Sequence, residues 1–272
     1  VLAFFQFILS ARCSFLRYTE NNYIILKRIT CLVGAFLLSS FSLLIFSYII
    51  SDFSVLNVFN NSHSNKPLIY KISGTWGNHE GSLLMWLTIL GIYGFFFTLT
   101  SKRISQKFTT KVLFALSLIN IGFIGFTVFT SNPFIRISPM PLEGSGLNPV
   151  LQDPGLAFHP PLLYLGYVGL TIPFAFSIGA LLEGKIDKTW SKEIRPWILI
   201  SWIFLTLGIT LGSFWAYYEL GWGGFWFWDP VENVSLMPWF CLTALIHTVI
   251  VLQKRNLLHS WTIILAITTF SL

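Results

Sequence analysis

Charged side chains are scarce in this sequence, since Asp, Glu, Lys and Arg together make up 10% of its 272 residues. A soluble domain carries about 25% charged residues, and 54% of this chain is hydrophobic. The composition therefore excludes an ordinary soluble protein and predicts an integral membrane protein. A net charge of +6 would suit a nucleic-acid partner. The basic residues are confined to particular loops, however, so membrane topology explains them and no nucleic acid is expected.

Cysteine is rare, and motifs for a serine or cysteine nucleophile are absent. The three cysteines are Cys13, Cys31 and Cys241, which lie far apart and form no Cys-x-x-Cys pair. They support neither a disulfide framework nor a zinc site. The carboxylates that could form an acid–base set are Glu80, Asp153, Asp229 and Glu232. The last two are better explained by helix capping, and no nucleophile accompanies them, so we expect no hydrolase.

Six apolar runs are long enough to cross a bilayer as helices. They cover about residues 32–50, 82–100, 112–129, 161–182, 197–215 and 231–252. Residues 1–11 are too few to span, and a further run that begins at Trp261 is cut off by the end of the sequence. We predict an all-α, polytopic transmembrane bundle with six full spans and partial spans at both ends, which forms a single membrane domain over residues 1–272.

The ends of the sequence suggest a piece of a longer protein. The chain begins at Val1 without a methionine and stops at Leu272 inside an apolar run. We therefore expect a fragment or one part of a divided protein, and the first run is not interpreted as a signal peptide.

The loops between the predicted spans alternate in basic charge. One side takes all but three of the 17 Lys and Arg residues, and the other side takes only Lys66, Lys71 and Arg136. By the positive-inside rule the basic side faces the cytoplasm or matrix, and the other faces the periplasm or intermembrane space. The loops rich in Trp, Gly, Pro and His all fall on this outer side, which is therefore the predicted working surface.

The segment from Gly221 to Asn233 reads Gly-Trp-Gly-Gly-Phe-Trp-Phe-Trp-Asp-Pro-Val-Glu-Asn, between two apolar runs. Asp229 at the N-cap, proline at the first helical position and Glu232 at the third predict a helix start. The aromatic residues are therefore expected on the loop before that helix.

This aromatic loop has the composition of a surface for a flat, partly apolar ligand. Trp226 and Trp228 would face the same way if the loop is extended, with Trp222 at its start. Gly223 and Gly224 would let a ligand approach the backbone closely. The alternative is a belt of interfacial tryptophans at the level of the lipid headgroups.

Two of the five histidines are candidate metal ligands. His247 is a readily ionisable side chain inside a predicted span, which is a functional-site hypothesis by default, and neutral imidazole is a good haem ligand. His159 lies at the start of another span, where the positive end of the helix dipole disfavours imidazolium. The alternatives are a hydrogen bond to a neighbouring helix for His247 and an anchoring or capping role for His159.

The two candidates cannot share one iron, because His247 lies about 20 Å along its helix while His159 is near the outer surface. The sequence predicts either two sites, each with an open ligand position, or one site and one structural histidine. His79 is a third candidate for which loop shaping is the favoured role. His63 and His259 are expected to be solvated.

Three motifs resemble one family. Residues 222–233 resemble the tryptophan-rich WWD signature of haem-handling membrane proteins. Residues 76–82, Trp-Gly-Asn-His-Glu-Gly-Ser, and residues 147–164, Leu-Asn-Pro-Val-Leu-Gln-Asp-Pro-Gly-Leu-Ala-Phe-His-Pro-Pro-Leu-Leu-Tyr, resemble the CcmF family of cytochrome c maturation. Phe225 stands where a tryptophan is common in the signature.

The resemblance implies a haem lyase subunit that promotes thioether attachment of haem to the Cys-x-x-Cys-His motif of apocytochrome c. The loop residues implied to hold the incoming haem are Trp222, Gly223, Gly224, Trp226, Trp228 and Asp229. His159 would be one outer ligand of that haem iron, and His247 one ligand of a resident transmembrane b-type haem. The family's second ligands lie downstream of Leu272, so the chain is expected to be inactive without a partner fragment.

The partners implied by the resemblance are a C-terminal CcmF-like fragment, a CcmH-type subunit, the haem chaperone CcmE, apocytochrome c and the lipid bilayer. The expected location is the mitochondrial inner membrane with the loop facing the intermembrane space, or else the bacterial inner membrane. The alternatives are a non-catalytic haem transporter or presenter of the CcmC type, and an assembly subunit that binds no haem. The motifs around Trp76 and Gln152 argue against the CcmC type.

Overall fold

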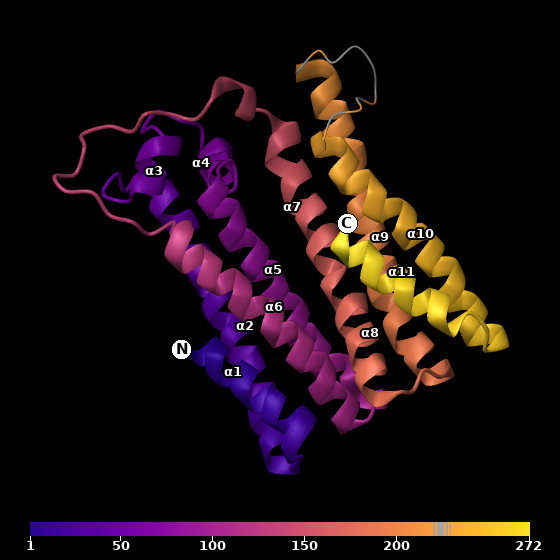
Figure 1. Cartoon of the computed structure of the whole chain (residues 1–272). Helices are drawn as coiled ribbons and strands as arrows, with labels where there is room; N and C mark the ends of the chain where they lie inside the picture. Colours follow the sequence, from indigo (N-terminus) through magenta and orange to yellow (C-terminus); the bar gives the residue numbers. More distant parts are fainter. Residues whose placement is uncertain (220, 222–225, 227, 229) are drawn as a thin grey trace.

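The computed structural model describes residues 1–219, 221, 226, 228 and 230–272, with the backbone alone for residues 230–232 (Figure 1). Over these residues the structure is all-α and contains no strand. In chain order the helices are α1 (Leu2–Ala11), η1 (Arg12–Leu16), α2 (Glu20–Ile49), α3 (Leu56–Asn61), α4 (Leu68–Gly74), α5 (His79–Thr100), η2 (Ser101–Arg103), α6 (Gln106–Thr130), η3 (Pro149–Leu151), α7 (Pro154–Gly169), α8 (Thr171–Glu183), α9 (Lys188–Glu219), α10 (Pro230–Arg255) and α11 (His259–Ser271).

Six helical segments in the described part of the chain are long and apolar enough to cross a membrane. They are Glu20–Ile49, His79–Arg103, Gln106–Thr130, Pro154–Glu183, Lys188–Glu219 and Asn233–Arg255. This number agrees with the six predicted spans, and the shorter apolar helices near the two ends match the predicted partial spans. The chain is an integral membrane protein with an all-α transmembrane bundle, as the sequence predicts.

The helices extend beyond the apolar runs because capping residues decide where they begin. Helix α2 starts at Glu20, well before residue 32, where the Thr19 side chain accepts a hydrogen bond from the Asn22 amide. Helix α5 starts at His79 under an Asn78 cap. Charged residues such as Lys27 therefore lie on a continuous helix rather than in a loop.

The fourth span is divided into α7 and α8. Pro173 has no N–H with which to bond the carbonyl of Gly169, so the regular hydrogen-bond pattern is interrupted there. The Leu170 amide instead bonds to Tyr167 O, three residues back, at 3.1 Å. The predicted single span over residues 161–182 is thus two helices that meet at Leu170.

Helix α7 lies in the middle of the bundle (Figure 1). It packs along α9, and α9 in turn packs against α10, while α2 packs against α5 and α8 against α6 and α11. The short helices α3 and α4 and the loop between α6 and α7 gather at one end, where α9 ends and α10 begins, and this end is called the outer end below. The basic turns at residues 101–105 and 184–187 lie at the opposite end. The loops at the outer end therefore lie opposite these basic turns, whereas most of the aromatic loop lies outside the described residues.

Candidate functional site at the outer end of α7, α9 and α10

The His159 ring is held against α9 by a hydrogen bond and by a glycine. Its Nδ1 lies 2.7 Å from the carbonyl oxygen of Gly208. A carbonyl can only accept, so Nδ1 carries the proton and Nε2 of the neutral ring keeps its lone pair. Nε2 has no hydrogen-bond partner among the described residues. This is the arrangement in which a backbone carbonyl fixes the tautomer of a metal-binding imidazole.

The ring fits against α9 because Gly212 has no side chain. A Cβ at Gly212 would lie 2.5 Å from His159 Cε1 and 2.8 Å from Nδ1. Any other residue at this position would displace the ring.

Helices α7 and α9 approach each other so closely that their backbones touch. A Cβ at Gly208 would lie 2.6 Å from Leu163 Cα, and a Cβ at Gly166 would lie 2.3 Å from the Leu205 nitrogen. Small residues give this kind of close contact between membrane helices. The approach brings the Gly208 carbonyl within reach of a histidine on the neighbouring helix.

A tyrosine ties the beginning of α7 to the end of α9. The carboxylate of Asp153 caps α7 by accepting from the Gly155 amide at 2.6 Å. The same carboxylate oxygen accepts a hydrogen bond from the hydroxyl of Tyr218. Since Tyr218 is three residues before Gly221, this contact fixes the end of α9 from which the aromatic loop departs.

Two tryptophans of the aromatic loop are described, and their rings are in contact. Trp226 and Trp228 lie with ring centroids 6.0 Å apart and planes at 75°, an edge-to-face pair. Trp228 is 76% exposed, while the indole nitrogen of Trp226 is buried and has no hydrogen-bond partner among the described residues. The pair offers an exposed aromatic face beside an unused donor.

The remaining predicted loop residues are Trp222, Gly223, Gly224 and Asp229, which lie outside the described residues, as does the side chain of Glu232. The backbone of α10 is described from Pro230 and is helical there, as the capping pattern predicts.

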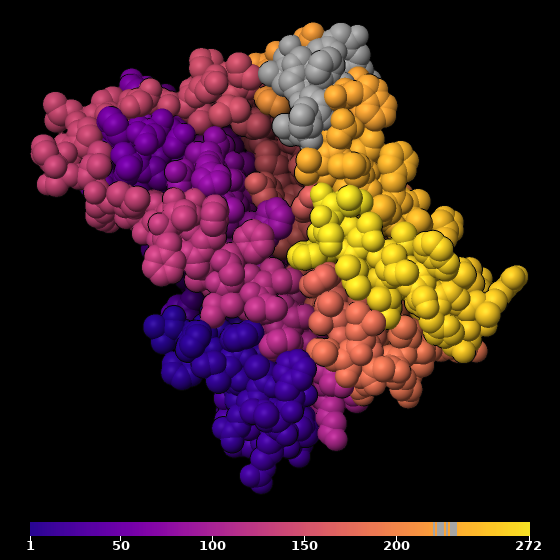
Figure 2. Space-filling model, viewed as in Figure 1, coloured from indigo at the N-terminus to yellow at the C-terminus, as the bar shows by residue number. Residues whose placement is uncertain are grey.

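Viewed as in Figure 2, the surface is hollowed where the outer part of α7 is set back between α4 and α5 on one side and α10 on the other.

His247 lies on the exposed side of α10 and has no hydrogen-bond partner among the described residues. The alternative role, a bond to a neighbouring helix, finds no support in this part of the chain. By the helical rise, His247 lies about 21 Å beyond Asn233, whereas His159 lies about 8 Å beyond Pro154. Helix α9 packs between the helices that carry the two histidines, so the structure does not bring them together.

A reciprocal pair of Trp–Thr hydrogen bonds fixes α10 against α9. The indole of Trp202 donates to Thr243 Oγ1 at 2.9 Å, and the indole of Trp239 donates to Thr206 Oγ1 at 2.8 Å. The two indole rings stack with centroids 6.0 Å apart. Since Thr243 is one turn before His247, this Trp–Thr pair sets the rotation of the helix that presents the histidine.

The other outer histidines have structural partners. His79 Nε2 lies 3.0 Å from Ser131 Oγ, and its ring meets Phe126 edge to face. Next to it, Asn78 caps α5 and its amide group bonds to Gly74 O at 2.8 Å. These contacts agree with the loop-shaping role favoured for His79.

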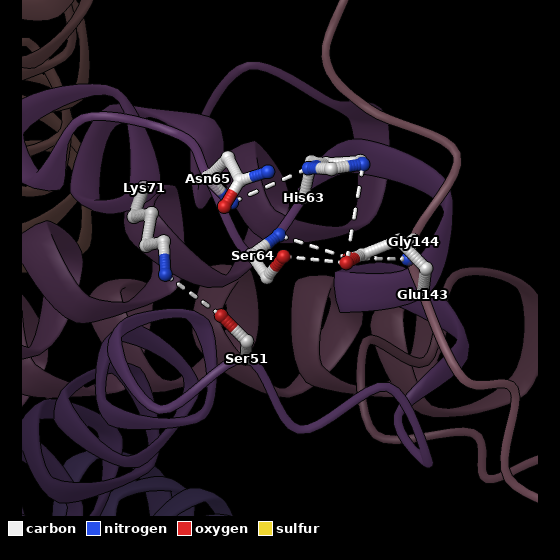
Figure 3. Close-up of polar contacts among 7 residues, drawn as sticks. All are labelled: Ser51, His63, Ser64, Asn65, Lys71, Glu143 and Gly144. Atoms are coloured by element: carbon white, nitrogen blue, oxygen red, sulfur yellow. Dashed lines mark hydrogen bonds and ion pairs between the residues drawn. The ribbon is translucent and has the colours of Figure 1, made fainter.

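Figure 3 shows how Glu143 joins the two long outer loops. Its carboxylate accepts hydrogen bonds from the amide of Ser64 at 2.9 Å, the amide of Gly144 at 3.0 Å and the Ser64 hydroxyl. These bonds, the Ser64 hydroxyl first, lower the pKa of Glu143 to about 2. His63 is nearby, 3.9 Å from the carboxylate, and half exposed. Glu80 likewise accepts a hydrogen bond from Asn57, so these two carboxylates hold loop residues in place.

Sequence reasoning did not single out Gly208, Gly212 or Tyr218. The two glycines are four residues apart on α9, which is the small-x-x-x-small spacing of close helix contacts. That spacing was the available signal for the interface, but it does not say which residue of α7 would face it.

Comparison with known proteins gives the family. Residues 76–272 match the family model described as "Cytochrome C assembly protein". The cytochrome c-type biogenesis protein CycK of Bradyrhizobium diazoefficiens is 57% identical over 234 residues, which cover 86% of this chain and 36% of that protein. The cytochrome c-type biogenesis protein CcmF of Escherichia coli K12 is 51% identical over 234 residues, which cover 86% of this chain and 36% of that protein. This chain therefore spans little more than a third of the length of these relatives.

A solved structure described as "Cytochrome c Heme Lyase CcmF" superposes on this chain with a TM-score of 0.87 at 30% sequence identity. The match covers 99% of this chain and 43% of that one. Sequence and structure therefore agree, and the chain belongs to the cytochrome c assembly protein family, within its CcmF group.

Proposed function

We propose that this chain is a haem lyase subunit that holds haem at the outer end of α7, α9 and α10 and presents it to apocytochrome c. His159 is the outer iron ligand, and the aromatic loop with Trp226 and Trp228 contacts the face of the macrocycle. Trp222, Gly223, Gly224 and Asp229 complete the loop in this proposal.

The observation that carries the proposal is the hydrogen bond from His159 Nδ1 to Gly208 O. It leaves Nε2 as a neutral lone-pair donor, which is the state an iron ligand needs. The Gly212 backbone beneath the ring restrains it from tilting. The exposed Trp228 and the buried, unpartnered indole of Trp226 suit a ligand with both an apolar face and polar edge groups.

The chain contributes binding and orientation, while the reacting thiols belong to the substrate. Each thioether forms when a cysteine S–H of apocytochrome c adds across a vinyl C=C of haem, so one C–S and one C–H bond form and no group leaves. His159 would fix the position of the iron, and the aromatic loop would fix the plane of the macrocycle relative to those thiols.

His247 is proposed as one ligand of a resident b-type haem. Its ring is inside a span, exposed and without a partner among the described residues, which fits a ligand that is completed from outside this segment. When bound there, such a haem supplies single electrons that keep the substrate haem reduced. The second ligand of each haem would come from a C-terminal CcmF-like fragment.

The remaining partners are proposed on family grounds: CcmE as the source of haem, a CcmH-type subunit and apocytochrome c. We place the chain in the mitochondrial inner membrane with the outer loops in the intermembrane space, or in a bacterial inner membrane with these loops in the periplasm. The charge asymmetry of the loops supports this orientation.

The test is the absorption spectrum, oxidised and reduced, of the chain purified with the downstream part of the family polypeptide. His247→Ala should remove a resident b-type signal, while His159→Ala should spare that signal and abolish cytochrome c maturation. A haem signal unchanged by His247→Ala would refute the transmembrane haem site and favour a CcmC-like presenter. No haem signal with or without the downstream part would favour the assembly subunit.

A further inference from the structure

A long apolar groove lies between α5 and α9, and neither His159 nor His247 is in its lining. Its volume is about 480 Å³, within the range of about 300–1,000 Å³ that is typical of ligand sites. The lining includes Ile92 and Phe96 of α5 and Ile200 and Phe204 of α9, with Leu165 of α7 between them. Phe96 is 51% exposed and Ile200 39% exposed, so the groove is open along its side.

The groove is parallel to the helices. On α9 the lining extends from Glu193 to Phe204, which is about 16 Å along the helix axis. Its floor is closed by Tyr93 and Trp197, whose rings lie 6.0 Å apart. An apolar groove of this length in a membrane-spanning part of the chain can hold an acyl chain aligned with the bilayer normal.

One carboxylate lies at the basic end of the groove. The Glu193 side chain is only 16% exposed, and its closest cation is Arg103, which is 84% exposed with Nη1 4.0 Å away. The two hydroxyls of the lining are satisfied, because Tyr93 donates to Leu165 O and Thr100 to Phe96 O. A largely desolvated carboxylate with one distant partner leaves room for a second cation.

We infer that the groove binds one phosphatidylethanolamine molecule, with an acyl chain along α9, the ammonium at Glu193 and the phosphate at Arg103. A primary ammonium has three N–H donors for the carboxylate. The phosphate of the same zwitterion matches the exposed guanidinium beside it. A purely anionic headgroup would place negative charge against Glu193, and a choline headgroup has no N–H to donate. The inference is independent of the haem sites.

The test measures which lipids the chain retains and responds to. The protein is purified in neutral detergent, its bound lipids are identified by native mass spectrometry, and its thermal unfolding is followed as dioleoyl-phosphatidylethanolamine, dioleoyl-phosphatidylcholine or dioleoyl-phosphatidylglycerol is added. We expect phosphatidylethanolamine to be retained and to raise Tm more than the other two lipids. Equal responses to all three, or retention of phosphatidylglycerol in preference, would overturn the inference.

Two variants separate the headgroup from the chain. Glu193→Gln should weaken phosphatidylethanolamine binding about tenfold, because a charge-assisted hydrogen bond is lost. Its control is Glu20→Gln, an exposed first-turn residue of α2 outside the groove. Ile200→Trp should fill the groove and reduce retention of every lipid, whereas Ile203→Trp, on the same helix but not in the lining, should not. Undiminished binding in both Glu193→Gln and Ile200→Trp would show that the lipid lies elsewhere.

Discussion

The placement of the His159 ring can be tested without removing the histidine, by adding one methyl group to α9. In Gly212→Ala the new Cβ would lie 2.5 Å from His159 Cε1, whereas carbon atoms in favourable contact are about 3.5–4.0 Å apart. The ring must therefore recede by about 1 Å or more. A retreat of α7 as a body would break its close backbone contact with α9 at Gly208, so we expect the ring itself to move.

The expected effect on folding is small. Overpacking a well-packed contact costs about 1–3 kcal/mol, and replacing glycine by alanine inside a helix returns up to about 1 kcal/mol. The net loss in the free energy of unfolding is thus about 0–3 kcal/mol, and we expect the variant to stay folded. The effect on function is expected to be larger, since a misplacement of about 1 Å in a reacting group can cost about 100-fold in rate.

The assay is the amount of covalently haem-bearing cytochrome c formed in cells in which this chain, with its partners, is the source of the lyase. We expect Gly212→Ala to lower that amount about 100-fold while the level of the folded chain is maintained. The control is Gly125→Ala on α6, where a Cβ meets nothing within 4 Å. Wild-type maturation in Gly212→Ala would refute the argument that the ring position matters.

Three further predictions concern the contacts around the site. Tyr218→Phe removes the hydroxyl that donates to Asp153, the cap of α7, and should lower the free energy of unfolding by about 1 kcal/mol and reduce maturation. Tyr217→Phe, equally exposed at 54%, should do neither. Thr206→Val and Thr243→Val should each lower the free energy of unfolding by about 1 kcal/mol, because each removes a Trp–Thr hydrogen bond. In a double-variant cycle the two effects should not add, since the two contacts are joined through the stacked indoles. The pKa of Glu143 is lowered to about 2 from 4.5, so the stability that its hydrogen bonds give to the outer loops should be complete above pH 4.5. This stability should be lost as the pH falls toward 2, and faster amide hydrogen exchange at Ser64 and Gly144 would show the loss.

The spans could be predicted because a bilayer of fixed thickness demands about 20 apolar residues, and no tertiary contact is needed to recognise that pattern. Their ends could not, since α2 begins at its Thr19 cap and carries Lys27 inside the helix. The break between α7 and α8 at Leu170 was not predicted either. It depends on the missing N–H of Pro173, and hydropathy alone does not distinguish this proline from the other residues of the span.

The candidate ligands were visible in the sequence for a similar reason. His247 is conspicuous as a polar residue in an apolar segment, and its exposed position on α10 agrees with a role that needs a further partner. The surroundings of His159 were not visible, because Gly208 and Gly212 lie about fifty residues later and act through a backbone carbonyl and a missing side chain. A hydrogen bond from a side chain to the backbone of another helix depends on how the two helices pack, and a local sequence pattern does not give that packing.

The backbone contact between α7 and α9 also restricts how the protein can move. At Gly208 and Gly166 there is no side chain whose rotamer could change to let one helix slide along the other. A shift of α7 by one turn would place Leu162 or Leu170 where Gly166 now meets Leu205. The two helices must therefore move as a rigid unit. Any opening or closing of the outer face around His159 then has to come from other elements, with the α7–α9 pair as the fixed frame against which they move.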